Sequence, residues 1–148
     1  MSEKIEAVAE VRANVSAEQL FDAWLDPAKV RAWMAAALQE MGLEGDIRAV
    51  EIDAREGGRF LFADQRGEAE ARHWGVYRAV DRPGRIEFTW ITDPADERDP
   101  SVVMLTITAD GENCLARIVH TIDARWAEYA PRISASWERM LRHAAEIA

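Results

Sequence analysis

Residues 131–148 read PRISASWERMLRHAAEIA, and this stretch decides the fold. Apolar side chains recur along it at steps of three or four residues, while charged residues occupy the positions between them. That period predicts an amphipathic helix with one face to be buried. The apolar positions are Ile133, Trp137, Met140, Leu141, Ala144 and Ala148. Because such a helix buries its apolar face against another layer, we expect it to cover a sheet formed earlier in the chain.

The rest of the chain reads mostly as strands. Residues 4–13, KIEAVAEVRA, alternate apolar and polar side chains, as a strand with one buried face does. Further strands are predicted at 47–55, 59–63, 70–80, 85–91, 101–109 and 114–121. Gly57-Gly58 and the run DRPG at 81–84 mark turns, and the acidic stretch 92–100 is predicted to be a loop.

Two short helices are predicted after the first strand. Ser16 and Gln19 have the spacing of a capping box, which starts a helix at residue 17. Asp26 followed by Pro27 ends that helix and starts a second one. The element order is therefore β-α-α-β-β-β-β-β-β-α. We predict an α+β fold in one domain spanning residues 1–148, with an antiparallel sheet covered on one face by the last helix.

Composition narrows the class of protein. The 148 residues include 18 basic and 27 acidic side chains, which gives a formal net charge of −9. That charge argues against binding to nucleic acid or to an anionic membrane, and no apolar run is long enough to span a bilayer. The N-terminal residues lack a signal-peptide pattern, and the lone Cys114 suits a reducing compartment. We therefore expect a cytoplasmic protein, with Cys114 in its core.

Several short motifs together resemble one known family. They are VSAEQLFDAW at 15–24 followed by DP at 26–27, WM at 33–34, REGGRF at 55–60, GVY at 75–77, VDRPGRI at 80–86, FTW at 88–90, HT at 120–121, and Trp137 with Leu141. Their order resembles the family of activator of heat-shock-protein-90 ATPase homologues, within the SRPBCC (START-like) superfamily. The resemblance implies a helix-grip fold, in which a curved antiparallel sheet wraps a long C-terminal helix. Ser136 stands where the family often has Gly, which implies a narrower space beneath that helix.

The sequence contains no recognisable metal or cofactor motif. The three histidines are His73, His120 and His143, and no pair of them has the spacing of metal ligands. We therefore predict no metal and no cofactor. His143 falls among polar positions of the last helix, so we expect it to be solvated.

His120 is the most interesting titratable group. It shares one face of its strand with Ala116 and Ile118, and by analogy with the family that face looks inward. A buried imidazole can orient a ligand carbonyl or move a proton, with Tyr77 as a candidate assistant. The alternative is a core histidine whose ring is hydrogen-bonded to a backbone carbonyl or a neighbouring hydroxyl.

Aromatic residues form the second candidate site. Phe60, Phe62, Tyr77, Phe88 and Trp90 fall at alternate positions of neighbouring strands. With His120, and with Trp137 and Met140 from the last helix, they would line an apolar cavity between sheet and helix. The same residues would also suit a filled core. Trp74 and Trp126 lie outside the family pattern, so we expect any additional ligand contacts there.

These observations, with the resemblance, leave three hypotheses. The sequence favours a non-enzymatic protein that binds a small hydrophobic or amphipathic molecule between the sheet and the last helix. The second is a cyclase- or dehydratase-like enzyme with His120 as acid or base, which needs His120 exposed in an open pocket. The third is a co-chaperone-like module with a chaperone partner, which needs an exposed apolar patch. A homodimer is compatible with all three.

Overall fold

The computed structural model describes residues 3–148. Its elements are β1 (Lys4–Ala13), α1 (Ala17–Leu25), α2 (Pro27–Glu40), β2 (Asp46–Ile52), β3 (Arg59–Arg66), β4 (Ala69–Asp81), β5 (Arg85–Trp90), η1 (Pro94–Asp96), β6 (Ser101–Asp110), β7 (Asn113–Asp123), η2 (Ala124–Tyr129) and α3 (Ala130–Ile147). The predicted order of strands and helices is confirmed. Within the described residues, no helix combines the length and apolarity needed to cross a membrane.

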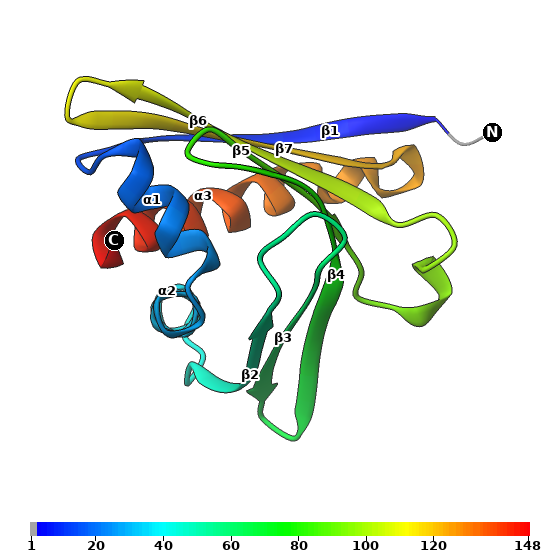
Figure 1. Cartoon of the computed structure of the whole chain (residues 1–148). Helices are drawn as coiled ribbons and strands as arrows, with labels where there is room; N and C mark the ends of the chain where they lie inside the picture. The colour runs from blue at the N-terminus through cyan, green and yellow to red at the C-terminus, as the bar shows by residue number, and fades with distance from the viewer. Residues whose placement is uncertain (1–2) are drawn as a thin grey trace.

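The strands form one antiparallel sheet of seven, in the order β1-β7-β6-β5-β4-β3-β2. The sheet curves strongly, so that the β2–β4 part projects away from the β1, β6 and β7 part (Figure 1). The long α3 helix runs along the concave side, and α1 and α2 lie beside it (Figure 1). This arrangement confirms the predicted α+β, helix-grip fold.

Local sequence signals set the helix boundaries. The Ser16 hydroxyl accepts a hydrogen bond from the Gln19 backbone N–H at 3.1 Å. The Gln19 side chain in return accepts from the Ser16 N–H at 3.0 Å. Asp26 caps α2 by accepting from the Ala28 N–H at 2.9 Å. Both predicted N-caps are confirmed, because each one satisfies backbone donors that have no partner inside the helix.

The structure corrects some element boundaries. The third strand continues to Arg66 rather than ending at residue 63, because residues 64–66 stay paired with β4. The second strand ends at Ile52, before the Gly57-Gly58 turn. The predicted loop 92–100 contains the short helix η1, and η2 was not predicted at all. These short helices lack the apolar period that identifies longer ones.

The core lies between α3 and the concave face of the sheet. Trp137, Leu141 and Ala144 of α3 are at most 3% exposed, which confirms the apolar face predicted for this helix. Trp24 of α1 stacks on Trp33 of α2, with ring centroids 4.6 Å apart. Cys114 is buried, as expected. The two short helices thus join the core through indole rings, and they close one end of the space beneath α3.

Candidate functional site

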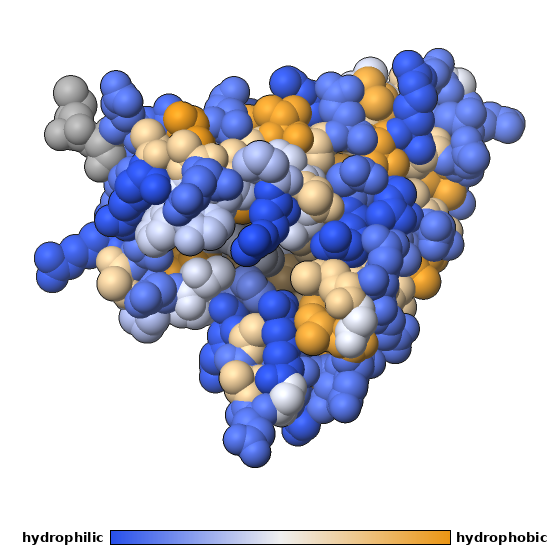
Figure 2. All heavy atoms as spheres, turned by 180° about the vertical axis from the view of Figure 1, so that it is seen from behind, coloured by the Kyte–Doolittle hydropathy of each residue, from blue (hydrophilic) through white to orange (hydrophobic). Residues whose placement is uncertain are grey.

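A cavity of about 720 Å³ lies between α2, α3, η2 and the concave face of the sheet. The molecular surface is hollowed near the centre of one face, above the projecting strands (Figure 2). The apolar lining residues are Trp33, Met34, Ala37, Leu38, Met41, Phe62, Trp90, Ala95, Ile122, Trp126, Ile133, Trp137 and Met140. Polar and charged side chains make up the rest of the wall. The volume is within the range of small-molecule sites.

The cavity contains five of the eight predicted site residues. These are Phe62, Trp90, His120, Trp137 and Met140. The rings of Trp90 and Trp137 are 5.0 Å apart, nearly edge to face, and form the deepest part of the aromatic wall. Ser136 also lines the cavity, so the residue at the family's glycine position does border this space.

The other three predicted residues, Phe60, Tyr77 and Phe88, do not line this cavity. Each is at most 3% exposed. The Phe60 ring lies 5.3 Å from Tyr77 and 5.6 Å from Phe88, and it lies 5.1 Å from Phe62 of the cavity wall. The three side chains pack on one another and on residues that line the cavity, so they form a filled layer next to its wall. For these residues the filled-core alternative describes their position.

His120 is held by a directed chain of hydrogen bonds. Ser101 donates its hydroxyl hydrogen to the Trp90 carbonyl at 2.7 Å. The same hydroxyl oxygen lies 2.8 Å from His120 Nε2, so Nε2 carries the proton and donates it. Trp137 Nε1 donates to His120 Nδ1 at 3.1 Å. The imidazole is therefore a neutral Nε2–H tautomer with both nitrogens occupied.

This geometry does not suit acid–base chemistry. His120 is 5% exposed, so it lacks the exposure that the enzyme hypothesis requires. Burial lowers the pKa of His120 to about 4, which keeps the ring neutral at pH 7. Burial also raises the pKa of Tyr77 well above its usual value. A neutral histidine whose two ring nitrogens are both hydrogen-bonded to the protein stabilises the packing of α3 on the sheet.

A polar cluster at the β3–β4 end of the cavity was missed by sequence reasoning. Asp64 is 1% exposed and forms an ion pair with Arg66, from Nε to Oδ2, at 2.7 Å. His73 stacks on Trp90 with ring centroids 4.8 Å apart. All four side chains line the cavity. The sequence signal was the alternation of Phe62, Asp64 and Arg66, which places a carboxylate and a guanidinium on the apolar face.

Exposed apolar side chains gather at the mouth of the cavity. Met41, Trp126 and Tyr129 line it and are 50%, 46% and 39% exposed. The Arg125 guanidinium lies over the Trp126 ring, 5.1 Å from its centroid. Trp126 therefore lies at the rim of the cavity. Trp74 instead lines a separate hollow on the opposite side of β3 and β4, and its indole N–H donates to Glu97.

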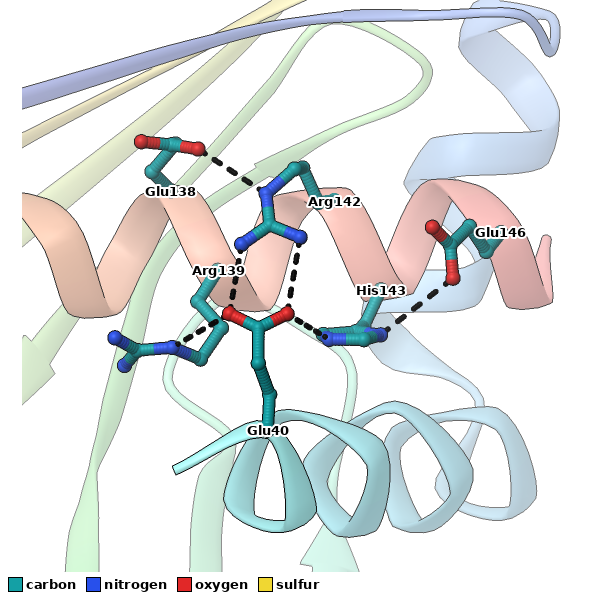
Figure 3. A network of polar contacts seen from close by, with 6 residues as sticks. All are labelled: Glu40, Glu138, Arg139, Arg142, His143 and Glu146. Carbon is teal, nitrogen blue, oxygen red and sulfur yellow. Dashed lines mark hydrogen bonds and ion pairs between the residues drawn. The ribbon is translucent and has the colours of Figure 1, made fainter. Parts of the chain in front are cut away.

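A charged junction joins α2 and α3 (Figure 3), and one of its residues, Arg139, lines the cavity. Glu40, the last residue of α2, accepts hydrogen bonds from Arg142 at 2.9 and 3.1 Å and from Arg139 at 3.1 Å. His143 lies 3.0 Å from the same carboxylate, and its other nitrogen lies 3.5 Å from Glu146. The prediction that His143 is solvated is wrong: its side chain is 15% exposed, because α2 packs over that face of α3.

Glu40 would by itself weaken the end of α2, since a helix C-terminus disfavours negative charge. Hydrogen bonds from Arg142 and then His143 lower the pKa of Glu40 to about 2, so the carboxylate stays ionised. Arg139 lines the cavity and Glu40 holds it, so the junction connects the packing of α2 and α3 to the shape of the cavity wall.

Replacing Glu40 by Gln is expected to loosen the junction of α2 and α3. The amide keeps the size of the side chain but removes the charge that Arg139 and Arg142 share. Amide hydrogen exchange at residues 37–41 should become faster. Glu138→Gln is the matched control, since the ion pair that Glu138 forms joins it to Arg142 on its own helix and not to α2. Equal exchange rates in the two variants would contradict this role of Glu40.

No group of three or more His, Cys, Asp or Glu side chains within residues 3–148 has a geometry that could hold a metal ion. Asp64 and His73 approach the same end of the cavity, but the Asp64 carboxylate is already paired with Arg66.

Comparison with known proteins gives a family and several similar folds. A family model described as Activator of Hsp90 ATPase homolog 1-like protein matches residues 14–148. A search of curated proteins found no match. A structure from Chromobacterium violaceum is 19% identical, with a TM-score of 0.77, covering 99% of this chain and 97% of the other.

Two further structures extend the comparison. An Hsp90 activator from Plasmodium falciparum is 19% identical, with a TM-score of 0.66 over 97% of this chain and 94% of its own. CalU16 from Micromonospora echinospora is 16% identical, with a TM-score of 0.63 over 98% of this chain and 85% of its own. At these identities the likeness shows the shared fold, and the function has to be argued from the cavity.

Proposed function

This chain belongs to the family of Activator of Hsp90 ATPase homolog 1-like proteins, and we propose that it binds one small amphipathic molecule in the cavity beneath α3. The observation that carries this proposal is the cavity itself, with its volume of about 720 Å³. Ligand sites in proteins have volumes of roughly 300–1,000 Å³ and mainly apolar walls. A space of this size, with Trp90 and Trp137 in its wall, is large enough for a small organic molecule.

The distribution of polar groups supports binding rather than catalysis. Both ring nitrogens of His120 are hydrogen-bonded, one to Ser101 and one to Trp137. The ring therefore stabilises the cavity wall without offering a proton to a ligand. Arg66 and His73 also line the cavity, at its β3–β4 end, and they keep hydrogen-bonding groups that a ligand could use. A molecule with an apolar body and one polar end would match this division.

A partner-binding role has one observation in its favour, the exposed Met41, Trp126 and Tyr129. Those side chains border the cavity mouth, which is also where an entering ligand needs apolar contacts. We therefore propose that they serve ligand entry. Binding to a chaperone stays a prediction, and a pull-down with a heat-shock-protein-90 homologue tests it.

Ser136→Phe is expected to weaken binding of a neutral apolar dye, N-phenyl-1-naphthylamine, by about tenfold or more, which corresponds to about 1.4 kcal/mol. Ser136 lines the cavity, so the larger ring would occupy part of the space that the dye needs. The measurement is a fluorescence titration of the dye at pH 7. Ser134→Phe is the control, because Ser134 is on the same helix and outside the cavity lining.

Two results would overturn the proposed function. The first is a wild-type protein that does not enhance the fluorescence of the dye at all. The second is a dye affinity that stays the same in Ser136→Phe, which would place the dye elsewhere on the protein. A thermal melt of each variant shows that it is folded before it is titrated.

A further inference from the structure

We propose that the cavity selects ligands that carry a carboxylate, and that Arg66 and His73 hold this group at the β3–β4 end. The inference rests on the proposed binding function and adds the chemical class of the ligand. It is argued from the placement of these side chains, from their unused hydrogen-bonding groups and from the charged side chains of the cavity wall.

The pairing of β3 with β4 brings the polar groups together. Phe62 lies opposite His73, and Asp64 lies opposite Ala71, in an antiparallel register. Side chains two residues apart on a strand share a face. Phe62, Asp64 and Arg66 therefore point to the same side as His73, which is the cavity side. An apolar ring and two polar groups thus lie next to each other on one wall.

Asp64 orients Arg66 without using all of its donors. Arg66 Nε lies 2.7 Å from Asp64 Oδ2, and Nη2 lies 3.4 Å from Oδ1. A guanidinium has five N–H donors in a rigid plane, and this pair uses two of them. Within residues 3–148 the remaining three have no partner. Because Asp64 is buried and fixed, the free edge of the guanidinium is held ready for an anion.

His73 adds a neutral donor beside the guanidinium. Its ring is stacked on Trp90 at 22°, which fixes its plane. Burial, assisted by the charge of Arg66, lowers the pKa of His73 to about 4, so at pH 7 the ring has one N–H donor and one acceptor. Neither ring nitrogen is hydrogen-bonded to any of the described residues 3–148. A ligand oxygen can therefore accept from His73 while another accepts from Arg66.

The cavity wall is less acidic than the protein as a whole. The chain has 18 basic and 27 acidic side chains. The charged residues that line the cavity are the basic Lys4, Arg66, Arg98, Arg125 and Arg139 and the acidic Asp64, Asp96, Asp99 and Asp123. Lys4 pairs with Asp99 and Arg125 with Asp96, so the open edge of the Arg66 guanidinium, rather than the net charge of the wall, would attract an anion. Since Asp64 already offsets part of the Arg66 charge, a singly charged carboxylate suits this site better than a more highly charged group.

Binding of decanoate and of 1-decanol at pH 7.4 tests the inference, because the two probes share a tail and differ in the head group. We expect the wild type to bind decanoate at least about tenfold more tightly than 1-decanol, as expected for one charge-assisted hydrogen-bonded pair. Quenching of tryptophan fluorescence reports both titrations, since Trp90 lies beside His73. Both probes are used below the concentrations at which they aggregate.

Two variants remove the carboxylate contacts separately. Arg66→Gln is expected to abolish the preference for decanoate and to leave the affinity for 1-decanol within about twofold. His73→Phe is expected to reduce the preference severalfold while it keeps the stack on Trp90. Arg66→Gln leaves the buried Asp64 without its ion-pair partner. If that variant fails to fold for this reason, His73→Phe decides the question, because it leaves the Asp64–Arg66 pair intact. Arg72→Gln is the control, because Arg72 points to the opposite face of β4 and pairs with Glu70.

The outcomes separate this inference from the proposed function. Equal binding of decanoate and 1-decanol by the wild type would overturn the carboxylate site while the cavity remains a binding site. A preference for decanoate that survives in Arg66→Gln and His73→Phe would overturn it as well. Failure of the wild type to bind either probe would overturn the proposed function and this inference together.

Discussion

Acidification from pH 6.5 to pH 4 is expected to destabilise the protein by several kcal/mol, because two buried histidines are neutral in the folded state. The pKa values of His73 and His120 are lowered from 6.5 to about 4, mainly by burial. Between these pH values the unfolded chain binds protons that the folded chain excludes, so stability falls as the pH falls. A pKa shift of this size corresponds to a loss of roughly 3 kcal/mol in the free energy of unfolding for each histidine, once the pH has fallen to the folded-state pKa or below.

Hydrogen bonding at His120 strengthens this expectation. A proton added to Nδ1 would face the Trp137 Nε1–H at 3.1 Å, so two donors would oppose each other. The ring could remain only if Trp137 moved, and Trp137 is part of the buried face of α3. Protonation of His120 therefore disturbs the contact between the sheet and its covering helix.

Urea unfolding followed by circular dichroism at several pH values between 7 and 4.5 tests the prediction. This window isolates the histidines, because the carboxylate of Glu40 has a folded pKa of about 2 and contributes only below its ordinary value of 4.5. His73→Phe should lose about half of the pH dependence. A wild-type stability that stays constant between pH 6.5 and pH 4.5 would contradict the buried, neutral state of these rings.

Gly75→Ala is expected to reduce the stability by about 3 kcal/mol or more, at the upper end of what overpacking costs. A β-carbon at residue 75 would lie 2.1 Å from the Thr89 carbonyl oxygen and 2.8 Å from the Thr89 hydroxyl. That hydroxyl accepts the Val76 N–H at 2.9 Å and joins β4 to β5. The close approach lies between the Trp74–Ile91 bridge and the Tyr77–Phe88 pair, so the methyl group would force β4 and β5 apart there.

Gly84→Ala is the matched control for this substitution. A β-carbon at residue 84 meets only the Ile107 carbonyl oxygen, at an ordinary 3.6 Å, so we expect a change of at most about 0.5 kcal/mol. Thermal and urea unfolding of both variants provide the comparison. Similar stabilities for Gly75→Ala and Gly84→Ala would show that the strands can separate at Gly75 without cost.

Much of the fold could be predicted because its signals are local. The capping box of Ser16, the Asp26-Pro27 helix start and the period of the last helix each depend on residues within one or two turns. Alternation along the strands predicted which faces look inward. The boundary errors at Arg66 and η2 arose where polar residues continue an element, because hydrophobic periodicity then gives no signal.

The candidate site was predicted only in part. Phe62, Trp90, Trp137 and Met140 were placed on the cavity wall, but Phe60, Tyr77 and Phe88 belong to the filled layer next to it. Alternation assigns a side chain to a face of the sheet, but it does not say how far the covering helix lies from that face. That distance depends on how the whole sheet curves, which is set by contacts between residues far apart in the sequence.

The sequence by itself determined the element order, the inward faces and the covering role of α3, since these follow from periodicity and capping within short segments. Tertiary structure alone decided the chemistry of the cavity. Whether His120 carries a usable proton depends on Ser101 and Trp137, which lie 19 and 17 residues away along the chain. Long-range packing sets the burial and the hydrogen-bond partners of a titratable group, and these in turn set its protonation state.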